Sequence, residues 1–331
     1  MKRLTQQLKR KRIWIALALL AFIYFNNCSW LSDPPQGSPF LLAHRGMSQT
    51  FPMEGIMNDT CTAERIYEPE HPYLENTIAS MDAAFKEGAA VVEFDVQPTL
   101  DGRFVVFHDW TLDCRTNGSG VTREHTVSEM QALDIGYGYT ADGGKTHPFR
   151  GKGIGMMPTL DEVLSTFPDH EFLIHMKSDD PAEGLLLAQY LRKLPSSRLQ
   201  QLTVYGGDNP VASAKASIPE LRAMSKSTMI RFVLTYAAIG WTGYVPDSLR
   251  HSQVHIPEKI APWLWGWPNR FMTRMTDADV RVIMVGGDGT EFSSGFDTPE
   301  DVRQRIPAAY TGGIWTNRID RIAPLFPKEA P

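Results

Sequence analysis

Cysteine is scarce in this chain, which has only three in 331 residues: Cys28, Cys61 and Cys114. They form no C-x-x-C pair, so the sequence offers no cysteine-based zinc site. Cys61 and Cys114 could form a disulfide if the chain is exported to an oxidising compartment. Two free thiols are the alternative, and the sequence leaves both states open.

Several common catalytic and nucleotide-binding signatures are also missing. No G-x-S-x-G motif occurs, which argues against a serine hydrolase. The stretch GGKT at 143–146 lacks the first glycine of a phosphate-binding loop, because residue 139 is tyrosine. The chain has no internal repeat and no low-complexity tract. P-loop nucleotide binding and repeat architectures are therefore disfavoured.

Negative charge is absent from the start of the chain. No acidic residue precedes Asp33, whereas residues 1–12 carry six lysines and arginines. The whole chain has a net charge of −5, so the remainder carries −11, which argues against nucleic acid as a partner.

The uncharged stretch 13–32 follows this basic segment and is apolar from 13 to 25. Its length predicts a transmembrane signal-anchor at 13–31, between a basic segment at 1–12 and a linker at 32–39. A cleaved signal peptide and a soluble chain are the alternatives. The basic residues before the span predict a single-pass membrane protein. Its N-terminus would be cytoplasmic, and its main domain, 40–331, would lie on the outer (periplasmic or extracellular) side.

Nine short apolar runs in the main domain predict strands. The second and third are separated by only seven residues, which is too short for a parallel crossover, so 97–109 should form an antiparallel hairpin. The other eight have longer connections and predict an α/β fold, a TIM (β/α)8 barrel, with a doubly wound sheet as the alternative. We also expect a helix capped by Asn76. The runs are 40–43, 91–96, 104–108, 172–174, 202–205, 221–225, 253–256, 280–285 and 313–316.

Polar residues gather where four of these strands end, at the barrel edge that carries active sites. Residues i and i+2 of a strand share a face, which applies to Glu93 with Asp95 and to His175 with Lys177. The gathered residues are His44, Arg45, Glu93, Asp95, His108, His175 and Lys177.

The types of these side chains favour chemistry on a phosphodiester. Two carboxylates on one face repel unless a cation lies between them, so Glu93 and Asp95 predict a divalent metal site for Mg²⁺ or Ca²⁺. Arg45 and Lys177 suit a phosphate group. The histidines can exchange protons near neutral pH.

In sequence order, five short motifs resemble the glycerophosphodiester phosphodiesterase family, with a weaker match at 312–318. The resemblance implies a TIM barrel with the hairpin as a cap, a cation held by Glu93 and Asp95, and His44 and His108 as acid and base. It implies hydrolysis of glycerophosphodiesters to an alcohol and glycerol 3-phosphate, with water or a substrate hydroxyl as the attacking group. The motifs are HRG at 44–46, ENT at 75–77, EFDV at 93–96, TLDG at 99–102 and FHD at 107–109.

The chain departs from the family pattern in three places. Residues 47–74 form an insertion expected at the barrel mouth, and Asn317 stands where the family often has aspartate. His175 takes the place of the family's third metal-binding glutamate. It is predicted as a metal ligand that shifts preference toward Mn²⁺ or Zn²⁺. A hydrogen bond to a metal-bound water, or no metal contact, are the alternatives for His175.

Two other functions are compatible with the sequence. The predicted anchor and the tryptophan-rich stretch 261–271 motivate phospholipase-D-like cleavage of lipids or lysolipids. The replaced ligand His175 motivates a barrel that binds a phosphodiester without cleaving it. The expected partners are a small-molecule phosphodiester and, through the N-terminal helix, a membrane. Glu75 and Asn76 either support the site or merely start a helix.

Overall fold

The structure is a computed structural model that describes residues 2–33, 35–57, 59–289 and 294–326. All nine predicted strands are present. Eight are parallel and follow the order β6-β5-β4-β2-β1-β9-β8-β7. They are β1 (Phe40–His44), β2 (Val91–Pro98), β4 (Glu171–Met176), β5 (Leu202–Gly206), β6 (Arg222–Ser225), β7 (Ser252–Pro257), β8 (Val280–Val285) and β9 (Gly313–Thr316).

This order brings the two ends of the sheet back together as a nearly closed barrel. Arg222, at the start of β6, donates from Nη1 to the backbone oxygen of Ser252, at the start of β7, over 2.8 Å. Alternate positions along each strand face inward, and five of them fill the barrel interior. These are Leu42, Val91, Leu173, Ile283 and Trp315.

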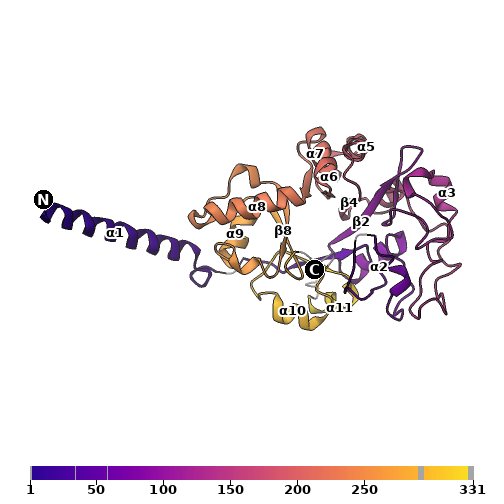
Figure 1. Ribbon diagram of the computed structural model, residues 1–331, viewed down its shortest axis with the longest axis horizontal. Helices are drawn as coiled ribbons and strands as arrows, with labels where there is room; N and C mark the ends of the chain where they lie inside the picture. The colour runs from indigo at the N-terminus through magenta and orange to yellow at the C-terminus, as the bar shows by residue number, and fades with distance from the viewer. Residues whose placement is uncertain (1, 34, 58, 290–293, 327–331) are drawn as a thin grey trace.

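Helices follow most of the strands and pack on the outside of the barrel (Figure 1). Apolar residues of strands and helices share one large cluster, which forms the main core. The helices are α2 (Ile78–Glu87), α3 (Val127–Gln131), α4 (Leu160–Thr166), α5 (Pro181–Leu191), α6 (Ser196–Leu199), α7 (Asp208–Ser217), α8 (Lys226–Ile239), α9 (Asn269–Asp277), α10 (Pro299–Arg305) and α11 (Ile319–Ile322).

The predicted cap of α2 is wrong by one residue. Thr77, not Asn76, accepts the hydrogen bond from the backbone N–H of Ser80. Asn76 instead adopts a left-handed backbone (φ 60°) and bonds to Asp95 through both its amide nitrogen and its amide oxygen. The residue therefore supports the site rather than the helix.

The cap over the barrel is larger than the predicted hairpin. Strand β3 (Phe104–Val106) pairs antiparallel with β2, as expected. A second hydrophobic cluster then combines insertion residues such as Ile66 and Leu74 with buried residues as far along the chain as Met157. Cys61 and Cys114 form a disulfide that joins these two parts. The insertion and the segment after β3 thus share one small core.

The N-terminal helix α1 (Lys2–Asn27) projects away from the barrel (Figure 1). Its last turn is held by Asn26 and Asn27, which both donate to the backbone oxygen of Trp241. No helix among the described residues has both the length and the apolarity to cross a membrane, so the predicted span at 13–31 is not supported. The apolar stretch 13–25 extends only about 20 Å as a helix, against a hydrocarbon core of about 30 Å. The rest of α1 is residues 2–12, which include six lysines and arginines, and the two asparagines at its end.

Candidate active site

Strand pairing brings the site residues together at the mouth of the barrel. His44 lies opposite Glu93 in the β1–β2 ladder, and Asp95 lies opposite His175 in the β2–β4 ladder. The next ladder pairs His175 with Tyr205. Paired strands are about 4.8 Å apart, so residues from four separate segments of sequence become direct neighbours.

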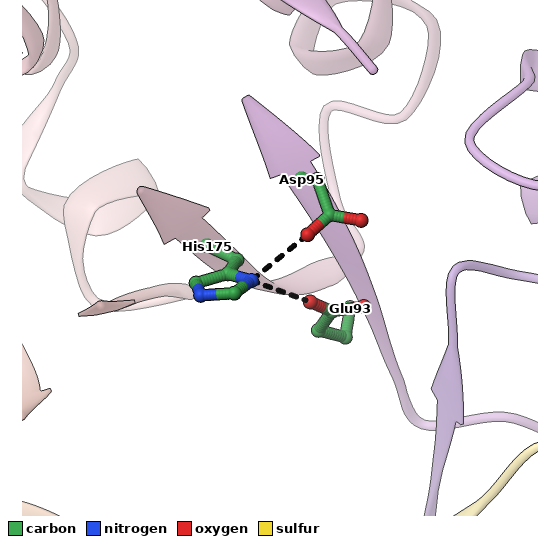
Figure 2. Close-up of side chains that lie close together, drawn as sticks. All are labelled: Glu93, Asp95 and His175. Atoms are coloured by element: carbon green, nitrogen blue, oxygen red, sulfur yellow. Dashed lines mark hydrogen bonds and ion pairs between the residues drawn. The ribbon is translucent and has the colours of Figure 1, made fainter. Parts of the chain in front are cut away.

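Glu93, Asp95 and His175 form the candidate metal centre. Both carboxylates are completely buried. Nδ1 of His175 lies 2.8 Å from Oδ1 of Asp95 and 3.8 Å from Oε1 of Glu93 (Figure 2). One possible ligand atom from each residue lies within 4.8 Å of the others. Two carboxylate oxygens and one imidazole nitrogen are suitable donors for a divalent cation.

The protonation of this cluster also fits a cation. Burial, and then the charge of Asp95, raises the pKa of Glu93 to about 8. Burial opposes ionisation of Asp95 as well, but Lys177 and Arg45 hold its pKa well below the ordinary value. Burial, and then Lys177, lowers the pKa of His175 to about 4, so this imidazole is neutral at pH 7. Positive charge placed between the carboxylates would take over the role of the proton on Glu93.

The two predicted phosphate-binding cations lie on either side of Asp95. Nε of Arg45 is 3.2 Å from Oδ2 of Asp95, and Nζ of Lys177 is 3.6 Å from Oδ1. Arg45 also pairs through Nη1 with Oε1 of Glu75, at 2.9 Å. Both cations are buried, which strengthens their attraction for an anion entering the site.

His44 is oriented by a chain of two residues. Asn317 donates from Nδ2 to Oδ2 of Asp297 (2.8 Å), which turns the amide oxygen Oδ1 of Asn317 toward Nδ1 of His44 at 2.6 Å. Nδ1 of His44 therefore carries a proton, and Nε2 faces the site, 3.8 Å from Oε2 of Glu93. Burial, and then the charge of Arg45, lowers the pKa of His44 well below its ordinary value.

His108 is oriented by its own neighbour in sequence. Nδ1 of His108 lies 2.7 Å from Oδ1 of Asp109, so the imidazole presents Nε2 to the site. Burial, followed by Arg45 and Lys177, lowers the pKa of His108. Both histidines thus have one nitrogen fixed by a partner and the other available for proton transfer.

Three cavities meet around these residues. A central cavity of about 90 Å³ is lined by His44, Arg45, His108, His175 and Lys177, with the insertion also on its wall. A larger cavity of about 580 Å³ continues from His44 and Arg45 between the insertion and the loops after β8 and β9. A third, of about 360 Å³, lies beyond His175. A phosphate group in the centre could therefore extend a substituent to either side.

The structure brings all seven predicted site residues together, and it adds others that the sequence reading missed. Tyr205 donates to Oε1 of Glu93 (2.6 Å) and stacks on His175. Tyr205 is the last residue of the predicted strand 202–205, so its position at the barrel mouth could have been predicted from the sequence. Arg115 donates from Nε to Oδ2 of Asp109 (2.8 Å). Asp297 and Arg115 had no such signal in the sequence, because both come from loops whose path depends on the fold.

Fold and site together define a (β/α)8 barrel whose mouth holds a candidate metal centre flanked by two histidines and two buried cations. The model of the glycerophosphoryl diester phosphodiesterase family matches residues 44–253, more than half of the chain. The chain belongs to this family.

Individual relatives agree with this assignment. A glycerophosphodiester phosphodiesterase of Bacillus subtilis (strain 168) is 37% identical over 123 residues, which are 36% of this chain and 39% of that protein. The chain therefore matches about two fifths of that curated relative.

Solved structures share the fold at low sequence identity. The glycerophosphodiester phosphodiesterase of Agrobacterium tumefaciens str. C58 has a TM-score of 0.56 at 22% identity, covering 87% of this chain and 98% of that one. A phosphodiesterase of Oleispira antarctica, in complex with the product sn-glycerol-3-phosphate, has a TM-score of 0.50 at 20% identity, covering 85% and 93%.

Proposed function

We propose that the chain hydrolyses glycerophosphodiesters to an alcohol and glycerol 3-phosphate in a metal-dependent reaction. The observation that carries the proposal is the central cavity, on which two oriented histidines, two buried cations and the candidate metal centre converge. The family relationship supports it, as does the product-bound relative from Oleispira antarctica.

Each group in the cavity has a role in this reaction. A divalent cation held by Glu93, Asp95 and His175 would supply positive charge to a non-bridging phosphate oxygen. Arg45 and Lys177 share the remaining negative charge of the phosphate.

Proton transfer is assigned to the two histidines. One accepts the proton of the attacking hydroxyl through Nε2, and the other donates a proton to the leaving alkoxide. The partners on their Nδ1 atoms hold both rings in the orientation that this exchange needs.

The test uses the full chain with glycerophosphocholine, glycerophosphoethanolamine and lysophosphatidylcholine, each with and without EDTA. We expect EDTA-sensitive release of glycerol 3-phosphate from the first two. Cleavage of lysophosphatidylcholine alone would instead favour the phospholipase-D-like activity. Tight binding of substrate without any hydrolysis would identify a non-catalytic barrel.

Variants then test the two histidines. His44→Ala and His108→Ala should each lower turnover by about 10²–10⁴. The matched control is His251→Ala, because His251 precedes β7 at the opposite end of the barrel, where it bonds to Asp279. Wild-type rates in both His44→Ala and His108→Ala would refute the assignment.

We also infer that the barrel resides in an oxidising compartment outside the cytoplasm. The Cys61–Cys114 disulfide supports this location, because reducing compartments keep such thiols free. Alkylation of the protein in intact native cells, followed by mass spectrometry, tests it. Alkyl groups on both cysteines would contradict the inference.

A further inference from the structure

Arg115 bonds to residues that hold the proposed active site. It is buried, and its Nε donates to Oδ2 of Asp109 at 2.8 Å, while Nη1 pairs with Oε2 of Glu75 at 2.9 Å. The other oxygen of Asp109 bonds to His108, and the other oxygen of Glu75 bonds to Arg45. One guanidinium therefore links the acid–base histidine of the cap to the phosphate-binding arginine of the barrel.

The position of Arg115 is fixed from the far side by the cap and the insertion. Nη1 also donates to the hydroxyl of Tyr139, and Nη2 to Oγ1 of Thr62, both at 2.6 Å. Thr62 follows Cys61 and Arg115 follows Cys114, so the disulfide joins the two backbones directly beside this contact. The segment that carries Thr62 is thereby tied by a covalent bond to the segment that carries Arg115.

The chemistry of the site explains why arginine is needed here. A planar fork with five N–H donors can bond to two buried carboxylates on different elements at once, in a fixed geometry. Lysine keeps the positive charge as a single point and cannot bond to Asp109 and Glu75 with the same geometry. We propose that Arg115, seated by the Cys61–Cys114 disulfide, is a positioning residue that sets the places of His108 and Arg45 relative to each other.

This inference rests on the proposed hydrolase function, and steady-state kinetics of Arg115→Lys test it. A misplacement of about 1 Å in a catalytic group can cost about 10²-fold in rate, so kcat should fall by about 10- to 100-fold. KM should rise, because Glu75, which holds Arg45, loses its contact with Arg115. The matched control is Arg150→Lys, since Arg150 lies in the same cap, exposed and over the ring of Tyr137. It should leave both constants unchanged.

The decisive measurement repeats Arg115→Lys in the His108→Ala background. If Arg115 acts on the rate through His108, its effect on kcat should shrink to less than about threefold there, while its effect on KM should persist. The double variant Cys61→Ser/Cys114→Ser should lower kcat by a smaller factor, and this loss should likewise shrink in the His108→Ala background. If Arg115→Lys does not fold, the double variant is used for the same comparison.

The outcomes separate this inference from the proposed function. Equal losses of kcat in both backgrounds would show a general structural effect and overturn the positioning role. Unchanged kinetics of Arg115→Lys would also overturn it, and in both cases the hydrolase function would stand. Absence of hydrolysis by the unmodified chain would overturn both proposals.

Discussion

Gly46 follows His44 and Arg45 at the point where the chain turns away from the end of β1, and we predict that Gly46→Ala is strongly destabilising. Its φ is +75°, in the left-handed region. A Cβ atom at this position would lie 2.7 Å from Oγ of Ser80 and 2.8 Å from both the carbonyl carbon and the carbonyl oxygen of Ser80. Ser80 belongs to α2, so the obstacle is mainly helix backbone and cannot simply rotate away.

The expected cost has two parts. A left-handed backbone costs a non-glycine residue about 1–2 kcal/mol. Forcing an extra methyl group into a closely packed place typically costs about 1–3 kcal/mol. The free energy of unfolding should therefore fall by about 2–5 kcal/mol. Activity should fall too, because a shift of α2 would move Glu75 and Asn76, which hold Arg45 and Asp95.

Gly102→Ala separates the two parts of this cost. Gly102 has a φ of +70°, nearly that of Gly46, but nothing lies within 4 Å of the Cβ position. Only the backbone contribution of about 1–2 kcal/mol should appear in this variant. Equilibrium unfolding in urea, followed by circular dichroism, measures both. If Gly46→Ala costs no more than Gly102→Ala, the argument from close packing is refuted.

Two further predictions concern metal binding and acid stability. His175→Ala should weaken the binding of Mn²⁺ by about tenfold or more, measured by calorimetric titration of the full chain, because a nitrogen ligand is lost; unchanged affinity would contradict ligation. Burial opposes ionisation of Asp109, but Arg115 and His108 hold its pKa below the ordinary 3.8. Its contribution to stability is therefore present above pH 3.8 and is lost as the pH falls through the lower native pKa. The melting temperature of the wild type should thus fall more steeply than that of Asp109→Asn below pH 3.8, and parallel curves would contradict this.

The barrel could be predicted because its strands are local signals. Each apolar run is short and bounded by turn residues, and the seven-residue gap before the run at 104–108 allowed only an antiparallel return. The extent of the cap could not be predicted in the same way. Its core joins Leu74 with residues as distant as Met157, and such a contact leaves no periodic pattern in either segment.

The site was predictable where its residues lie on strands. Glu93 and Asp95 had to share a face, and strand ends had to meet at the mouth. The residues that orient the histidines were harder to find. Arg115 and Asp297 act through loops, and their partners become neighbours only after the chain has folded.

The partners of the two histidines also differ in charge, which bears on their roles. Asn317 gives His44 a neutral acceptor and leaves the carboxylate of Asp297 one residue further away. His108 instead bonds directly to the carboxylate of Asp109, which stabilises the protonated ring. A neutral ring is suited to accept a proton, and a ring beside a carboxylate is suited to hold one until the leaving group needs it. We therefore infer that His44 is the base and His108 the acid. Asparagine at 317 thus gives His44 a neutral partner where His108 has a charged one, although by the family pattern it is only a departure.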